Sequence, residues 1–138
     1  MTIETLAPVP VAFTITEAML FQAMQAQISS NPAIVDIDFA LVDFVPGNIN
    51  LTVRMTDGTL GEVAVSVVDA DGFVVFQIDS ITVGGAAAPV AFVESVQREL
   101  MTLLVDSFDV LLVQQFGAWQ YVASMVVTEM EIVVEAMP

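Results

Sequence analysis

The stretch FALVDFVPGNINLTVRM, residues 39–55, predicts a β-hairpin. Apolar and polar side chains alternate on both sides of a Pro-Gly-Asn turn, which is the pattern of two half-buried antiparallel strands. The alternation is clearest in the second strand, where four apolar residues share one face: Ile49, Leu51, Val53 and Met55. Such a face must pack against something apolar. Either another part of the chain or a ligand has to cover it.

The composition joins high hydrophobicity to a strong negative charge. Hydrophobic residues make up 57% of the 138 positions, and 17 acidic residues against two arginines give a net charge of −15. The mean hydropathy is +0.83. The uncharged runs 18–35 and 110–128 contain several Gln, Ser and Asn residues and lack the flanking basic residues of membrane spans. The sequence therefore predicts a soluble domain without a transmembrane segment.

The same composition argues against several classes of function. The chain has no histidine, cysteine or lysine, so the commonest general bases and nucleophiles are missing, and we expect no enzyme. Nucleic acids and anionic membranes are disfavoured as partners, because both attract clustered Lys and Arg. Asp36 and Asp38 alternate along a strand, where a solvated face is favoured over a shared metal ion or proton. The DADG sequence at 69–72 lacks a Glu at the twelfth position of a calcium loop and is interpreted as a turn, so neither a metal nor a cofactor is expected.

Turn and helix signals divide the chain into one domain, residues 13–138, after an extended arm at 1–12. TITE at 14–17 predicts a capping box with Thr14 as the N-cap of a first helix. Turns at 46–48, 56–58 and 69–72 then separate four strands, and Gly84 and Gly85 allow a sharp bend before a long second helix at 89–116. Residues 121–136 complete the chain as a strand or a bent pair of strands. The predicted fold class is α+β, in the order helix, four-stranded antiparallel meander, long helix, strand, with the curved sheet wrapped on the long helix.

Strand alternation also predicts which residues face inward. In the first meander strand Val35, Ile37, Phe39 and Leu41 share the inner face. An unusual number of apolar residues then fall on the outer faces: Ile34, Ala40, Val42, Val68, Phe73, Val75, Ile81 and Val83. The polar side of the long helix is assigned to Glu94, Arg98, Glu99, Asp106 and Asp109, with Glu94 and Arg98 as an i,i+4 pair. Large exposed apolar surfaces usually mark binding sites, so the surplus predicts either a cavity for an apolar ligand or a subunit interface.

Four segments carry a resemblance to a known family. FTITE at 13–17 opening a helix, the VPGNINLTV and DADGFVVFQI hairpins, and ITVGGAAAPVAFV leading into a long helix are similar to small bacterial members of the tubular lipid-binding (TULIP) superfamily, including YceB-like lipoproteins. The resemblance covers about residues 13–136 and implies an antiparallel sheet around a long helix, with lipid in the groove between them. It also implies a location outside the cytoplasm, although neither a leader nor a lipidation cysteine is visible in the sequence.

We therefore expect non-enzymatic binding or carriage of a lipid or fatty acid. The residues expected to border one continuous apolar cavity are Phe21, Met24, Met55, Phe76, Phe92, Leu100, Leu104 and Phe108. The alternative is a structural or assembly domain that uses the same apolar surface as a homodimer interface.

Overall fold

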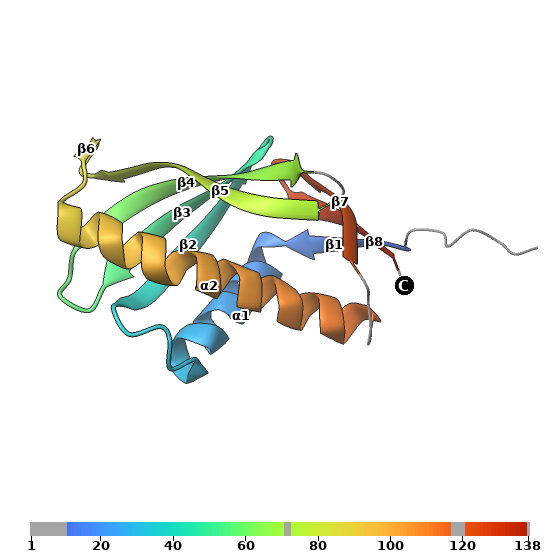
Figure 1. The fold of residues 1–138 in the computed structure, drawn as a ribbon, viewed down its shortest axis with the longest axis horizontal. Helices are drawn as coiled ribbons and strands as arrows, with labels where there is room; N and C mark the ends of the chain where they lie inside the picture. Colours follow the sequence, from blue (N-terminus) through green and yellow to red (C-terminus); the bar gives the residue numbers. More distant parts are fainter. Residues whose placement is uncertain (1–10, 71–72, 117–120, 138) are drawn as a thin grey trace, which may run out of the picture.

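The computed structural model describes residues 11–70, 73–116 and 121–137, and Figure 1 shows how the elements are arranged. The elements are, in order, β1 (Val11–Thr16), α1 (Glu17–Ser30), β2 (Ile37–Val45), β3 (Asn48–Met55), β4 (Leu60–Ala70), β5 (Phe73–Val83), β6 (Ala86–Ala87), α2 (Val90–Phe116), β7 (Tyr121–Val127) and β8 (Glu131–Met137). Strands β2 to β6 form one antiparallel sheet in sequential order, and β1, β8 and β7 form a second antiparallel sheet in that order. The predicted α+β class and the meander are confirmed, with five strands in the larger sheet rather than four.

Local turn chemistry explains the meander. Pro46 and Gly47 join β2 to β3 as a two-residue loop, and Gly47 has a φ of 81°, which a side chain would disfavour. Gly84 and Gly85 join β5 to β6 with φ values of 61° and 78°, as a two-residue hairpin with two positive φ angles requires. The second pair adds the short fifth strand that the sequence pattern did not indicate.

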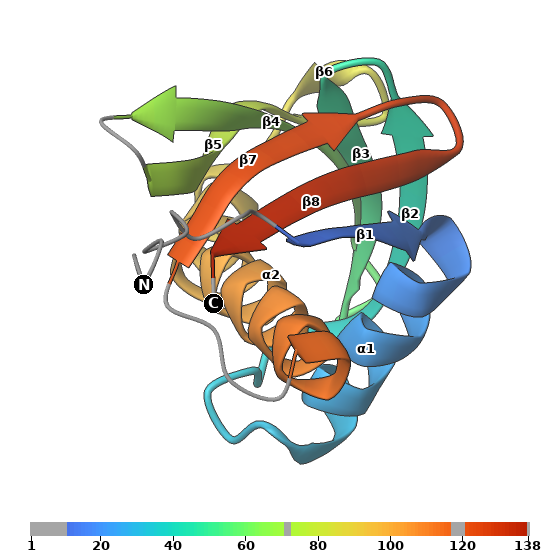
Figure 2. The same ribbon diagram turned by 90° about the vertical axis from the view of Figure 1, so that its right-hand side faces the viewer.

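Helix α2 lies along the inner side of the curved strands, as Figures 1 and 2 show. Its apolar face contributes much of the core: Phe92, Val96, Leu100, Leu103, Leu104, Phe108, Leu111 and Leu112 are all buried. The strands supply the opposite side of this core, including Ile49, Leu51, Val53, Val63 and Val65. Helix α1 packs against α2 and against β2, so it closes one side of the structure. None of the helices in the described ranges has the length and apolar character needed to cross a membrane.

The first helix begins later than predicted. Thr14 lies within β1, and the N-cap is Thr16, whose Oγ1 accepts a hydrogen bond from the backbone N–H of Met19 at 3.2 Å. Phe13 and Ile15 are buried, and they pair with Val134 and Ile132 of β8. This pairing with the far end of the chain favours a strand over another helical turn. Residues 11 and 12 of the predicted arm also belong to β1, and the rest of that arm lies outside the described residues.

A β-bulge reverses the predicted faces of β2. Ile37 pairs with Met55 and Phe39 with Arg54, so Asp38 is an additional residue without a partner position in β3. Beyond the bulge Ala40 is fully buried and Leu41 is 49% exposed, the opposite of the prediction. Val35, which lies before the strand, is 62% exposed. Asp38 forms an ion pair of 2.8 Å with Arg54 on the neighbouring strand.

A second bulge has the same effect on β5. Val65 pairs with Ile78 and Ala64 with Ser80, so Asp79 is the extra residue, and its carboxylate accepts a hydrogen bond from Ser66 Oγ at 3.1 Å. Of the eight residues predicted on outer faces, two are buried and three pack against the core: Ile34 and Ala40, then Val42, Ile81 and Val83. The apolar surplus is therefore smaller than the alternation indicated. Gly72 and the Phe73 side chain lie outside the described parts.

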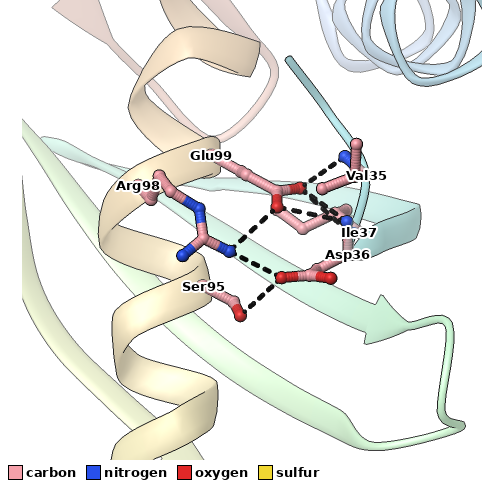
Figure 3. Close-up of polar contacts among 6 residues, drawn as sticks. All are labelled: Val35, Asp36, Ile37, Ser95, Arg98 and Glu99. Atoms are coloured by element: carbon pink, nitrogen blue, oxygen red, sulfur yellow. Dashed lines mark hydrogen bonds and ion pairs between the residues drawn. The ribbon is translucent and has the colours of Figure 1, made fainter. Parts of the chain in front are cut away.

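Glu99 is buried instead of lying on a polar helix face. Its carboxylate accepts hydrogen bonds from three consecutive backbone N–H groups, those of Val35, Asp36 and Ile37, at 2.9–3.2 Å (Figure 3). Arg98 pairs with Asp36 at 2.6 Å, and more distantly with Glu99, rather than with Glu94 as predicted. These contacts anchor the start of β2 to the N-terminal half of α2.

Side chains of α1 also cover the free edge of β2. Gln25 Oε1 accepts a hydrogen bond from the Ala40 N–H at 3.3 Å, and Glu17 Oε2 accepts one from the Phe44 N–H at 3.2 Å. An open strand edge invites pairing with another chain, and side-chain acceptors of this kind block it. The larger sheet is therefore closed to extension at β2.

Candidate functional site

An apolar groove opens between α2, β5 and β7. It has a volume of about 280 Å³ and is lined by Val75 and Phe76 of β5, by Met101, Val105, Phe108, Asp109 and Leu112 of α2, and by Val122 and Met125 of β7. Met101, Val105, Phe108 and Leu112 follow one another at spacings of three and four, so they form one stripe along the helix, with Asp109 beside it. The rings of Phe76 and Phe108 lie with their centroids 4.9 Å apart.

The sheet topology explains why this stripe of α2 stays open. Strand β5 is paired with β4 and, at Thr82 and Val83 only, with β6, whereas β7 is paired with β8. The two sheets therefore meet at this side without a continuous hydrogen-bonded ladder between β5 and β7. Val75 and Val105 are about half exposed on the two sides of the opening. The groove is thus an apolar surface that the fold leaves accessible.

The structure distributes the eight predicted ligand-binding residues over several places. Phe76 and Phe108 line the groove together. Met55 and Phe92 border a separate depression of about 330 Å³, whose other lining residues are mainly polar or small: Asp36, Thr56, Asp57, Thr59, Pro89, Ala91 and Ser95. Met24, Leu100 and Leu104 are fully buried in the core. Phe21 packs edge-on against Phe39, with ring centroids 5.9 Å apart, and Arg54 stacks over Phe39.

Most groove residues were not predicted. A second apolar stripe on the long helix, beside the one that fills the core, was the available signal: Met101, Val105, Phe108 and Leu112 follow the helical period. Val122 and Met125 could not be assigned in the same way, because their position depends on where the second sheet packs. Their contribution follows from the long-range pairing of β7 with β8.

The acidic residues do not gather into a metal site in the described parts of the chain. Asp36 and Asp38 point to different partners, since Asp36 binds Ser95 and Arg98 whereas Asp38 binds Arg54. Asp57 lies in the β3–β4 turn, where the backbone N–H of Thr59 donates to its carboxylate at 2.9 Å. This hydrogen bond, together with one from the Thr59 side chain, lowers the pKa of Asp57 below its usual value.

Comparison of this chain with models of protein families, with curated proteins and with solved structures finds no match. Its site is therefore interpreted from its own geometry.

Proposed function

We propose that this protein binds an apolar ligand, without catalysis, in the groove between α2, β5 and β7. The observation that carries the proposal is the lining itself, in which eight of the nine residues are apolar and the ninth is Asp109. Small-molecule sites are typically concave and mostly apolar, with few polar groups. The groove is accessible, and covering an apolar surface so that water leaves it lowers the free energy. An apolar ligand can provide that cover.

The dimensions favour a slender ligand. A volume of about 280 Å³ lies near the lower end of the range for small-molecule sites, roughly 300 Å³. We therefore propose a ligand with a single hydrocarbon chain, such as the tail of a one-chain lipid. Met101 of α2 and Met125 of β7 both line the groove, and unbranched thioether side chains adapt to irregular apolar ligands.

The resemblance to tubular lipid-binding domains adds a second line of support. We propose on that basis that the chain is a TULIP-like carrier acting outside the cytoplasm. A long helix beneath curved antiparallel strands, with an apolar groove beside it, is the arrangement that the resemblance implies.

The direct test uses an uncharged fluorophore that brightens in apolar surroundings, such as N-phenyl-1-naphthylamine. Val105→Glu places a carboxylate in the groove, where an apolar ligand would have to cover it, so binding should weaken about tenfold or more. Val113→Glu is the matched control, because both valines are on α2, they are 49% and 45% exposed, and both stand four residues from Asp109. Of these two valines, Val105 lines the groove and Val113 does not. Equal binding by both variants and the wild type would refute the proposal.

The homodimer alternative uses the same surface. Val75 and Val105 are exposed at the groove, and two copies placed face to face would cover them. Native mass spectrometry without detergent separates the two proposals. A dimer that dissociates in Val105→Glu but persists in Val113→Glu, with no dye uptake by the wild type, would support assembly in place of ligand binding.

A further inference from the structure

We infer that the groove prefers an amphiphile with a cationic head, such as an alkylammonium, over one with an anionic head. The inference rests on the proposed function and specifies the chemical class of its ligand. It follows from the single charged residue of the lining, Asp109, and from the positions of the two arginines.

Asp109 follows Phe108 on α2, and both residues line the groove, where Asp109 is exposed and Phe108 is buried. Asp109 is exposed, and within the described residues no hydrogen bond or ion pair engages its carboxylate. The neighbouring Asp106 differs, since it accepts a hydrogen bond from Asn31 Nδ2 at 2.7 Å. Asp109 is thus available to a charged group at the end of an apolar chain.

Among the described residues, no cationic side chain lines the groove to receive an anionic head. The chain has no lysine or histidine, and its two arginines are Arg54 and Arg98. Arg54 pairs with Asp38 at 2.8 Å, and Arg98 pairs with Asp36 at 2.6 Å. Arg98 precedes Asp109 by eleven residues, which is roughly 16 Å along a helix axis. A carboxylate head would therefore meet Asp109 without a compensating partner.

The whole-protein field acts in the same direction. A net charge of −15 attracts cations and repels anions over distances of about one Debye length. An alkylammonium gains from Asp109, from this field and from the burial of its tail. A fatty acid with the same tail gains only from burial, and its head is repelled.

Three ligands with the same tail test the inference: decylammonium, decanol and decanoate, each displacing the uncharged fluorophore at neutral pH and low salt. Decylammonium should bind about tenfold more tightly than decanoate, with decanol between them. Raising the salt concentration should reduce the difference in affinity between decylammonium and decanoate, because exposed charges are screened by salt. Binding of decanoate equal to or tighter than that of decylammonium would overturn the inference and leave the proposed function intact. Failure of all three to bind would overturn both.

A pair of variants locates the selectivity. Asp109→Asn should lower the affinity for decylammonium about two- to fivefold, the range for an exposed ion pair, and should leave decanol unchanged. Asp43→Asn removes the same charge from β2, at an exposed position that does not line the groove. It should have a smaller effect. Equal losses in the two variants would show that the overall charge selects the ligand, and would overturn the role of Asp109.

Discussion

The backbone N–H of Asp36 donates to both carboxylate oxygens of Glu99, at 2.9 and 3.1 Å. The same carboxylate accepts hydrogen bonds from the backbone N–H groups of Val35 and Ile37. The Asp36 carboxylate in turn accepts hydrogen bonds from the Arg98 and Ser95 side chains (Figure 3). Residues 35–37 thus have their backbone donors satisfied by a helix rather than by a neighbouring strand. A buried carboxylate holds the first meander strand against the long helix.

Removing this carboxylate should be costly. Glu99→Ala leaves a buried backbone N–H, that of Ile37, without its acceptor and is expected to destabilise the fold by about 3 kcal/mol. Glu99→Gln keeps one acceptor oxygen and should cost about half as much. Urea unfolding at neutral pH measures both changes.

The control for these variants is Gln97→Ala, an exposed position on the same helix, which should stay within about 0.5 kcal/mol of the wild type. A Glu99→Ala protein as stable as the control would contradict the anchoring role.

Local signals allowed the central part of the fold to be predicted. The meander follows from period-two alternation and from turns that contain Gly47 and Gly58, both of which have positive φ. The long helix follows from an apolar stripe that begins after Pro89, and its observed start at Val90 differs by one residue from the prediction. These turns and the start of the helix are determined by residues close together in the sequence, so a single sequence is enough to predict them.

The faces of two strands could not be predicted, because a bulge shifts the alternation by one residue. Asp38 and Asp79 are polar residues in strands where a solvated position is the ordinary interpretation. Both residues are partly or fully exposed, and each is also the inserted residue of a bulge whose carboxylate binds a side chain of the neighbouring strand, Arg54 or Ser66. Beyond each bulge, residues expected outside face the core.

The candidate site depended on contacts between distant segments. Phe76 and Phe108 were selected as apolar residues on the appropriate elements, and the structure places them together. Leu104, on the same helix, is fully buried and has no access to the groove. Which stripe of α2 remains open is decided by β7 and β8, and β8 lies between β7 and β1 from the other end of the chain. No local pattern specifies that arrangement.

A close approach at Gly61 gives a second prediction. A methyl group at this position would overlap the ring of Phe92 and would lie 2.9 Å from the carbonyl oxygen of Thr82. Gly61→Ala should therefore destabilise the protein by about 2 kcal/mol, as overpacking of a core does. Denaturant unfolding of the purified variant provides the measurement.

Phe92→Leu tests the cause, because a smaller side chain removes part of the overlap with a methyl group at Gly61. The double variant should be less destabilised than the sum of the two single changes, with a coupling of at least about 0.5 kcal/mol. Simple additivity would place the cost of Gly61→Ala elsewhere in the structure.

Asp57 gives a prediction about pH. Its hydrogen bonds from Thr59 lower the pKa of the carboxyl group below its ordinary value, so the folded state holds the proton less tightly than the unfolded state. The resulting stabilisation is complete above the unfolded pKa of about 4 and is lost as the pH falls through the folded value. The stability difference between the wild type and Asp57→Ala should therefore shrink on acidification below about pH 4.

Thr59→Ala keeps the backbone donor and removes only the side-chain hydrogen bond to Asp57, so it should retain part of this pH dependence. Thermal unfolding at several pH values compares the three proteins. A difference between wild type and Asp57→Ala that grows towards acid pH would have the wrong sign.

Membrane binding provides the last prediction. Seventeen acidic residues against two arginines repel an anionic surface, and at 0.01 M salt the Debye length of about 30 Å extends that repulsion beyond contact. The protein should therefore stay at the bottom of the gradient when floated with anionic vesicles in low salt and chelator. Vesicles without net charge provide the comparison, because any binding to them reports apolar contact through surfaces such as the groove. Strong flotation with anionic vesicles alone, reversed by added salt, would reveal an electrostatic attraction that this charge distribution does not provide.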